Sequence, residues 1–222
     1  MATVPVDAVV LDMDGVIVDS EAMWDAARRA VVAEYGGAWE ASSTRDMMGM
    51  SSPEWSAHLH NRLGVPLAPE TISRLVVERM IVGYRERLPL LPGAVAAVQR
   101  IASRWPLGLA SSSNRPVIDA ALSASGLDRC FAVTVSSEEV ARGKPAPDVY
   151  QAAVAALGVA PGRAVAIEDS TNGLRAAASA GMRVIALPNQ EFPPAPDALA
   201  HAAVVLGSLD ELTVDAVLAA AR

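Results

Sequence analysis

The chain has 222 residues, of which 52% are apolar and 19% are charged, and its formal net charge is −7. This balance is typical of a globular protein with a sizeable core and excludes an intrinsically disordered chain. Because non-specific nucleic-acid binding needs a basic surface, the acidic charge predicts no nucleic-acid partner. We find neither a run near the roughly 20 apolar residues of a membrane span nor a signal-peptide pattern, so we expect no membrane association and a cytoplasmic protein.

The first predicted element is a buried strand at about residues 7–12, an apolar run that ends in acidic residues. After Ser20 the pattern becomes helical and shows no convincing strand before about residue 88. The expected helices in this block lie at residues 21–35, 52–63 and 69–87. The block therefore predicts an all-helical insertion at residues 20–88.

From residue 91 onward, helical and strand patterns alternate. Helices are expected at residues 93–104, 116–125, 147–157, 174–180 and 214–221, and strands at residues 107–110, 131–135, 164–167, 183–187 and, more weakly, 203–206. Strands separated by helices are typical of βαβ units and a parallel sheet. The predicted fold class is α/β: a Rossmann-like parallel-sheet core formed by residues 1–19 and 89–222, with an all-helical cap inserted at residues 20–88.

Polar residues follow several of the predicted strands, and the carboxyl ends of parallel strands line the ligand crevice of an open α/β sheet. The first strand delivers Asp12 and Asp14, the second delivers Ser111, a later loop carries Lys144, and another strand ends in Glu168-Asp169. Taken one at a time, these residues could be a turn, a strand-end cap and a solvated loop lysine. Their arrival at one edge from four segments favours a functional site instead.

These segments resemble the motifs of the haloacid dehalogenase-like (HAD) hydrolase superfamily. The resemblance lies in Asp12-Met13-Asp14-Gly15, Ser111, Lys144 and Glu168-Asp169, in the order and context of the four HAD motifs, and it covers nearly the whole chain. Residues 14–21 and 173–182 are also similar to the helical-cap subfamily of phosphoglycolate phosphatase-like, sugar-phosphatase-like and β-phosphoglucomutase-like proteins.

The resemblance implies a phosphomonoester hydrolase that works through an aspartyl-phosphate intermediate. Asp12 would be the nucleophile, and Asp14 would protonate the leaving alcohol and then deprotonate the hydrolytic water. Ser111 and Ser112 would bind the phosphoryl oxygens, and Lys144 would balance charge on the phosphate and the nucleophile.

The acidic cluster itself predicts a metal, because carboxylates held close together resist joint ionisation without a cation. Mg²⁺ takes oxygen ligands and commonly keeps several waters. The resemblance implies that its ligands are the Asp12 carboxylate, the Asp14 main-chain carbonyl, Asp169, and Glu168 either directly or through water.

The expected partner is a small phosphorylated metabolite, with a sugar or polyol phosphate favoured, and the expected oligomeric state is a monomer. Substrate contacts are predicted for residues of the cap and of the loop after the second core strand, namely Trp24, Met48, Gly49, Ser52, Asn114 and Arg115. A hexose-phosphate mutase is the alternative, although Arg45 is the one cation near the cap segment 47–52. A non-catalytic phosphate-binding protein is a further alternative, but no motif residue is missing.

Overall fold

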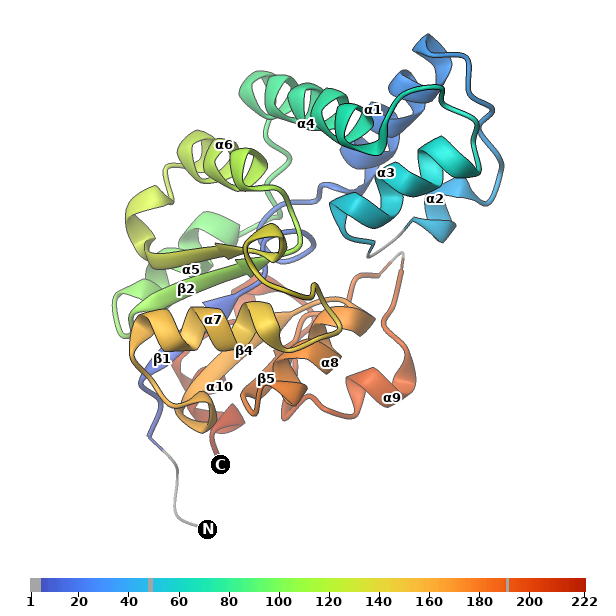
Figure 1. Ribbon diagram of the computed structural model, residues 1–222. Helices are drawn as coiled ribbons and strands as arrows, with labels where there is room; N and C mark the ends of the chain where they lie inside the picture. Colours follow the sequence, from blue (N-terminus) through green and yellow to red (C-terminus); the bar gives the residue numbers. More distant parts are fainter. Residues whose placement is uncertain (1–4, 48–49, 191) are drawn as a thin grey trace.

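A parallel sheet forms the centre of the protein, for which the computed structural model describes residues 5–47, 50–190 and 192–222 (Figure 1). The strand order is β3-β2-β1-β4-β5-β6, and every neighbouring pair is parallel. The strands are β1 (Ala8–Leu11), β2 (Leu107–Ser111), β3 (Phe131–Ser136), β4 (Ala164–Glu168), β5 (Arg183–Ala186) and β6 (Val204–Val205). The predicted Rossmann-like α/β class is confirmed.

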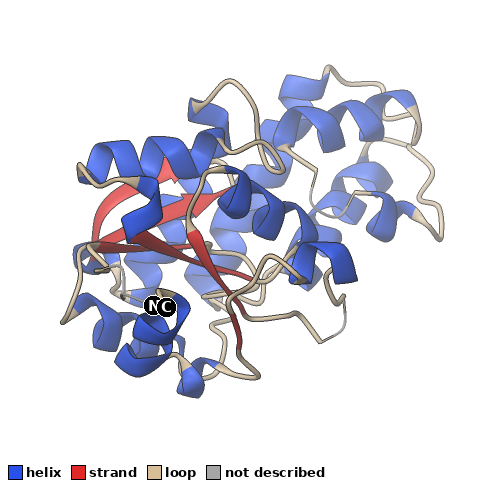
Figure 2. Ribbon diagram, turned by 90° about the horizontal axis from the view of Figure 1, so that it is seen from below, coloured by secondary structure: helices blue, strands red, loops and turns tan. Residues whose placement is uncertain are grey.

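The helices are α1 (Glu21–Glu34), α2 (Ser43–Asp46), α3 (Ser52–Asn61), α4 (Pro69–Glu86), α5 (Ala94–Ala102), α6 (Arg115–Ser125), α7 (Asp148–Leu157), α8 (Thr171–Ser179), α9 (Pro196–Leu199) and α10 (Val214–Ala220). From α5 onward they lie on both sides of the sheet (Figure 2). One face packs against α5, α6 and α10, and the other packs against α7 and α8. The sheet is therefore the middle layer of three.

Successive side chains of a strand point to opposite faces of the sheet, and the two faces differ here in the size of their side chains. The face toward α5 and α6 carries bulky side chains such as Leu11 and Ile167, whereas the opposite face carries small ones such as Ala110 and Ala166. Small residues let α7 and α8 approach the sheet closely. This close approach brings side chains of α7 and of the loop before it over the carboxyl end of β4.

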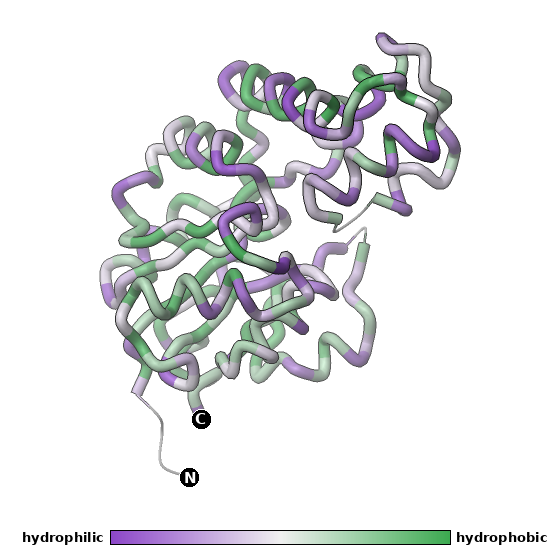
Figure 3. The backbone as a smooth tube through the Cα atoms, in the orientation of Figure 1, coloured by the Kyte–Doolittle hydropathy of each residue, from purple (hydrophilic) through white to green (hydrophobic). Residues whose placement is uncertain are grey.

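Helices α1 to α4 are inserted between β1 and α5 and lie together at one end of the molecule (Figure 1). Along α4 the buried residues Ile72, Val76, Met80 and Tyr84 repeat at helical spacing, and hydrophilic and hydrophobic residues alternate along it in Figure 3. The apolar cluster of the bulky sheet face continues into this insertion through Val16, Ile17 and Val18. Where the cap begins and ends, at residues 20 and 88, stays a prediction.

Candidate active site

The carboxyl ends of β1 and β4 bring three buried acidic residues to one place. Asp12 follows β1, Glu168 ends β4 and Asp169 follows it, and one oxygen of each lies within 4.8 Å of the others. β1 and β4 pair in register from Ala8 opposite Ala164 to Leu11 opposite Ile167, so the two strands end at the same level of the sheet. The sequence motifs thus meet because of the strand order.

Lys144 enters this cluster from the loop before α7. Its Nζ lies 2.9 Å from Asp12 Oδ1 and 2.6 Å from Glu168 Oε1, and the side chain is 3% exposed. Burial alone would lower the pKa of Lys144, but the two carboxylates outweigh burial and hold the pKa above its ordinary value. Lys144 therefore remains a cation that fixes the Asp12 carboxylate.

Glu168 is fully buried, and both of its oxygens have hydrogen-bond donors. Oε1 accepts from Lys144 Nζ and from the Tyr150 hydroxyl at 3.0 Å. Oε2 accepts from the amide of Asp169 at 3.0 Å and from the amide and hydroxyl of Ser170 at 3.1 Å each. The carboxylate is thus held in a single orientation between Lys144 and the start of α8.

Asp169 has the opposite character, because its Oδ1 is buried and finds no hydrogen-bond donor within the described ranges. Burial, followed by the charges of Glu168 and Asp12, raises the pKa of Asp169 well above its ordinary value. Burial, the largest cause, and the charges of Glu168 and Asp14 raise the pKa of Asp12 to about 7, while the charge of Lys144 opposes this shift. A divalent cation bound by oxygen ligands would satisfy this arrangement, so the residues fit a metal site.

Gly15 shows how closely the β1 loop approaches Asp169. Its φ of +77° is left-handed, and a Cβ at this position would lie 2.0 Å from Asp169 Oδ2. Only glycine leaves room here for the carboxylate. The turn at Asp14-Gly15 is therefore present, and it gives the Asp169 carboxylate its place beside the β1 loop.

Asp14 is held by hydroxyl groups from two separate segments. Ser20 donates to Oδ1, while Ser113 donates to Oδ2 at 2.7 Å and Ser111 donates to the same oxygen at 3.4 Å. Ser111 is fully buried, and its Oγ also accepts from the Ser113 amide at 3.0 Å. The loop after β2 is thereby connected to the acidic residue of the loop after β1.

A cleft of about 700 Å³ opens between this acidic cluster and the helical insertion. From the core it is lined by Asp12, Asp14, Ser112, Ser113, Lys144 and Asp169 among others, and from the insertion by Glu21, Trp24, Arg28, Arg45, Met47, Met50, Ser52 and Trp55. Its size is in the range of small-molecule sites. The motif residues thus lie on one wall, and residues of helices α1, α2 and α3 form the facing wall.

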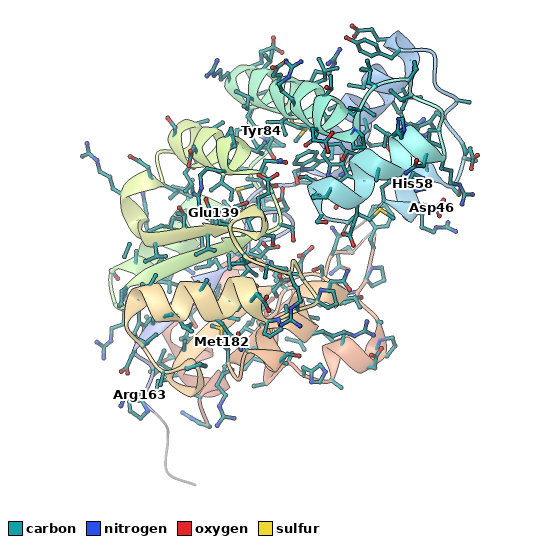
Figure 4. All side chains as sticks on the ribbon, in the orientation of Figure 1. Asp46, His58, Tyr84, Glu139, Arg163 and Met182 are labelled. Carbon is teal, nitrogen blue, oxygen red and sulfur yellow. The ribbon has the colours of Figure 1, made fainter. Side chains whose placement is uncertain are left out.

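The predicted substrate contacts divide into three groups. Trp24 and Ser52 line the cleft, and Ser52 also donates to Asn114 Oδ1 at 2.8 Å. Arg115 is not among the residues that line the cleft. Its guanidinium instead donates to Thr134 on β3 and to Glu139 in the turn after β3. Glu139 is labelled on the core in Figure 4. Met48 and Gly49 lie outside the described residues.

Several residues of the site were not singled out in the sequence. Ser113 binds Asp14, Tyr150 binds Glu168, and Arg28 and Trp55 line the cleft. Helical spacing could have found Arg28, because it lies four residues after Trp24 on the same face of α1. Tyr150 gave no such signal, because its role depends on how α7 packs on the sheet.

These features define a class of protein with an α/β core and an acidic, lysine-bearing site at the carboxyl end of its central strands. The chain belongs to the haloacid dehalogenase-like hydrolase family, whose family model matches residues 6–181. The family predicted from the motifs is therefore confirmed.

Three relatives illustrate the similarity. Hexitol phosphatase B of Escherichia coli K12 is 36% identical over 212 residues, covering 93% of this chain and 94% of the relative. The phosphorylated carbohydrates phosphatase of Thermotoga maritima is 33% identical over 180 residues, covering 81% and 83%. The crystal structure of CbbY from Rhodobacter sphaeroides in complex with phosphate has a TM-score of 0.85 and 30% identity, covering 96% of this chain and 99% of that one. Among the described residues no helix is long and apolar enough to cross a membrane.

Proposed function

We propose that this protein is a Mg²⁺-dependent phosphatase that hydrolyses a sugar or polyol phosphate through an aspartyl phosphate on Asp12. The observation that carries the proposal is the placement of Asp12, which is ion-paired to a buried Lys144 at 2.9 Å and lines the cleft. The relatives named as carbohydrate and hexitol phosphatases support the substrate class.

In the first half of the reaction an Asp12 oxygen attacks phosphorus, and the bond from phosphorus to the ester oxygen breaks. Asp14 gives its proton to the leaving alkoxide, which departs as an alcohol. Lys144 orients the nucleophile and balances charge on the phosphoryl oxygens, and Ser112 at the cleft wall donates to one of these oxygens. The chain thereby supplies in-line positioning and charge stabilisation.

In the second half Asp14 accepts a proton from water, the water oxygen attacks phosphorus, and the Asp12–phosphorus bond breaks. Inorganic phosphate leaves and both aspartates return to their starting state. Asp12, Asp169 and the Asp14 carbonyl would hold Mg²⁺, which supplies further stabilisation of negative charge on the phosphoryl group when bound. Glu168 would act mainly on Lys144 and on the start of α8, because its oxygens are already engaged.

The test is a phosphate-release assay over hexose, hexitol and glycerol phosphates and 4-nitrophenyl phosphate, with Mg²⁺ or with EDTA. We expect turnover of a narrow set of sugar or polyol phosphates that requires Mg²⁺. Asp12→Asn should abolish turnover, whereas Asp215→Asn, on an exposed position of α10, should not change it. Isomerisation of glucose 1-phosphate with little phosphate release would contradict the proposal in favour of a mutase.

A further inference from the structure

Arg28 is an unusual side chain for the wall of a cleft, because it is charged and yet only 7% exposed. It lies on α1 and lines the cleft opposite the acidic cluster. Its Nε has no hydrogen-bond partner within the described part of the chain. A buried donor without a partner is costly, so the arrangement calls for an acceptor that arrives with a ligand.

Two indole rings hold this guanidinium in place. The Cζ of Arg28 lies 5.2 Å from the ring centroid of Trp24 and 5.2 Å from that of Trp55. The rings themselves are 6.1 Å apart at 55°. Trp24 comes from α1 and Trp55 from α3, so the guanidinium is fixed by two elements through cation–π contacts. It is a preorganised donor rather than a mobile surface charge.

Carboxylates surround Arg28 on the side of α1. Glu21, Trp24 and Arg28 follow one another at helical spacing and all three line the cleft. Burial lowers the pKa of Arg28 to about 10, while Glu21, Asp25 and Asp14 counteract the shift. Burial raises the pKa of Glu21, and Arg28 opposes that shift. From α3 the cleft receives Ser52 and Trp55, which carry no charge, and from α2 it receives Arg45, a second cation, whose charge is not among those that shift the pKa of Arg28.

The balance of charge decides which ligand chemistry fits. A second phosphate beside Arg28 would also lie near Glu21, whose carboxylate would repel it. Hydroxyl groups suit the pair better, because guanidinium N–H groups donate to their oxygens and Glu21 accepts from their O–H groups. The indole faces meanwhile cover the C–H surface of a carbohydrate.

We infer that Arg28, clamped between Trp24 and Trp55, is a specificity-determining residue that donates hydrogen bonds to hydroxyl groups at the end of the substrate remote from its phosphate. This inference rests on the proposed function and adds to it a structural basis for the choice among phosphate esters. Substrates with a chain long enough to reach Arg28 are preferred over glycerol or glycolate phosphates, and sugar monophosphates are preferred over bisphosphates.

The experiment compares Arg28→Met and Arg28→Lys with Arg29→Met, a matched control whose side chain is 52% exposed and pairs with Asp25. Each variant is assayed on a hexitol 6-phosphate, glycerol 3-phosphate and a hexose bisphosphate, with Tm measured for each. For Arg28→Met we expect KM for the hexitol 6-phosphate to rise about 10- to 100-fold, the range of a hydrogen bond to a charged group. KM for glycerol 3-phosphate should rise less than about 3-fold.

Arg28→Lys retains the positive charge but lacks the planar guanidinium group with its several N–H donors. Its KM for the hexitol 6-phosphate should therefore fall between those of the wild type and Arg28→Met. Arg29→Met should leave all three substrates within about twofold of the wild type, as expected for a surface substitution. A second readout is the quenching of tryptophan fluorescence by the free hexitol. The concentration of hexitol that gives half of the maximal quenching should rise at least about tenfold in Arg28→Met.

Two results would overturn the inference. An equal loss on all substrates together with a lower Tm would make Arg28 a structural clamp for the tryptophans. A larger loss on the bisphosphate than on the monophosphate would make it an anion site. The proposed function fails separately, if the wild type releases phosphate from none of these esters with Mg²⁺.

Discussion

At the scale of single residues, the site depends on how closely the start of α8 approaches Glu168. A Cβ at Gly173 would lie 1.7 Å from Glu168 Oε1, so the carboxylate occupies the space of the missing side chain. Gly173→Ala must displace Glu168 and, through their ion pair, Lys144. Because a misplacement of about 1 Å can cost about 100-fold in rate, we expect kcat/KM to fall by about that factor in phosphate-release assays.

The matched control for this substitution is Gly162→Ala, where the nearest atom to an added Cβ, the Gly181 carbonyl oxygen, is 4.0 Å away. This variant should keep its kcat/KM within about twofold, in line with a surface change outside the site. Wild-type activity in Gly173→Ala would show that Glu168 does not need its present position.

Tyr150 supplies a second residue-scale prediction. Its hydroxyl donates to Glu168 Oε1 at 3.0 Å from a fully buried position on α7. Tyr150→Phe removes this donor but leaves Lys144 on the same oxygen. We expect the free energy of unfolding to fall by about 1 kcal/mol, the value of an ordinary hydrogen bond, as measured by urea denaturation. A loss above about 3 kcal/mol would mean that Lys144 alone cannot hold Glu168.

At the scale of elements, a buried hydrogen bond between the helical insertion and the core is open to a direct test. Ser52, at the start of α3, donates to Asn114 Oδ1 at 2.8 Å in the loop after β2. If the insertion holds substrate against the core, Ser52→Ala should raise KM more than it lowers kcat, by about 3- to 10-fold for a single neutral hydrogen bond. Steady-state kinetics on the preferred substrate provides the measurement.

Ser125→Ala is the comparison, because this hydroxyl donates only to carbonyls within its own helix α6. Its KM should remain that of the wild type. Equal behaviour of the two variants would mean that the contact between Ser52 and Asn114 does not influence substrate binding.

Elements also show how far the sequence could predict the structure. Periodicity located every helix of seven or more residues, but α2 and α9, with four residues each, are too short to show it. Helix α8 was expected at residue 174 and begins at Thr171, because Ser170 caps it by accepting from the Gly173 amide. The motif residues at strand ends were predictable from topology, and Arg28 could have been found from its helical spacing to Trp24. Tyr150 depends on tertiary packing that no local pattern encodes.

At the scale of the whole molecule, the site and the stability of the fold oppose each other. Asp12, Glu168 and Asp169 are buried together with Lys144, a cluster of three acidic groups and one basic group. Burying like charges together is unfavourable, and a bound cation relieves the repulsion. The folded protein should therefore be more stable with Mg²⁺ than with EDTA, by about 2.7 kcal/mol when the free ion is 100 times its dissociation constant.

Asp169→Asn separates the repulsion among the buried carboxylates from the stabilisation by Mg²⁺. It removes one negative charge while nearly preserving the shape of the side chain. Oδ1 of Asp169 has no donor among the described residues, so the metal-free protein loses repulsion and few favourable contacts. We expect Tm in EDTA to rise by about 2 to 4 °C, as about 1 kcal/mol produces in a chain of this length, and the further rise on adding Mg²⁺ to disappear. Asp215→Asn should keep the wild-type Tm in EDTA and the full Mg²⁺ response. A lower Tm in EDTA for Asp169→Asn would mean that Asp169 stabilises the fold without a cation. The residue that favours metal binding at the expense of stability would then be Asp12 or Glu168.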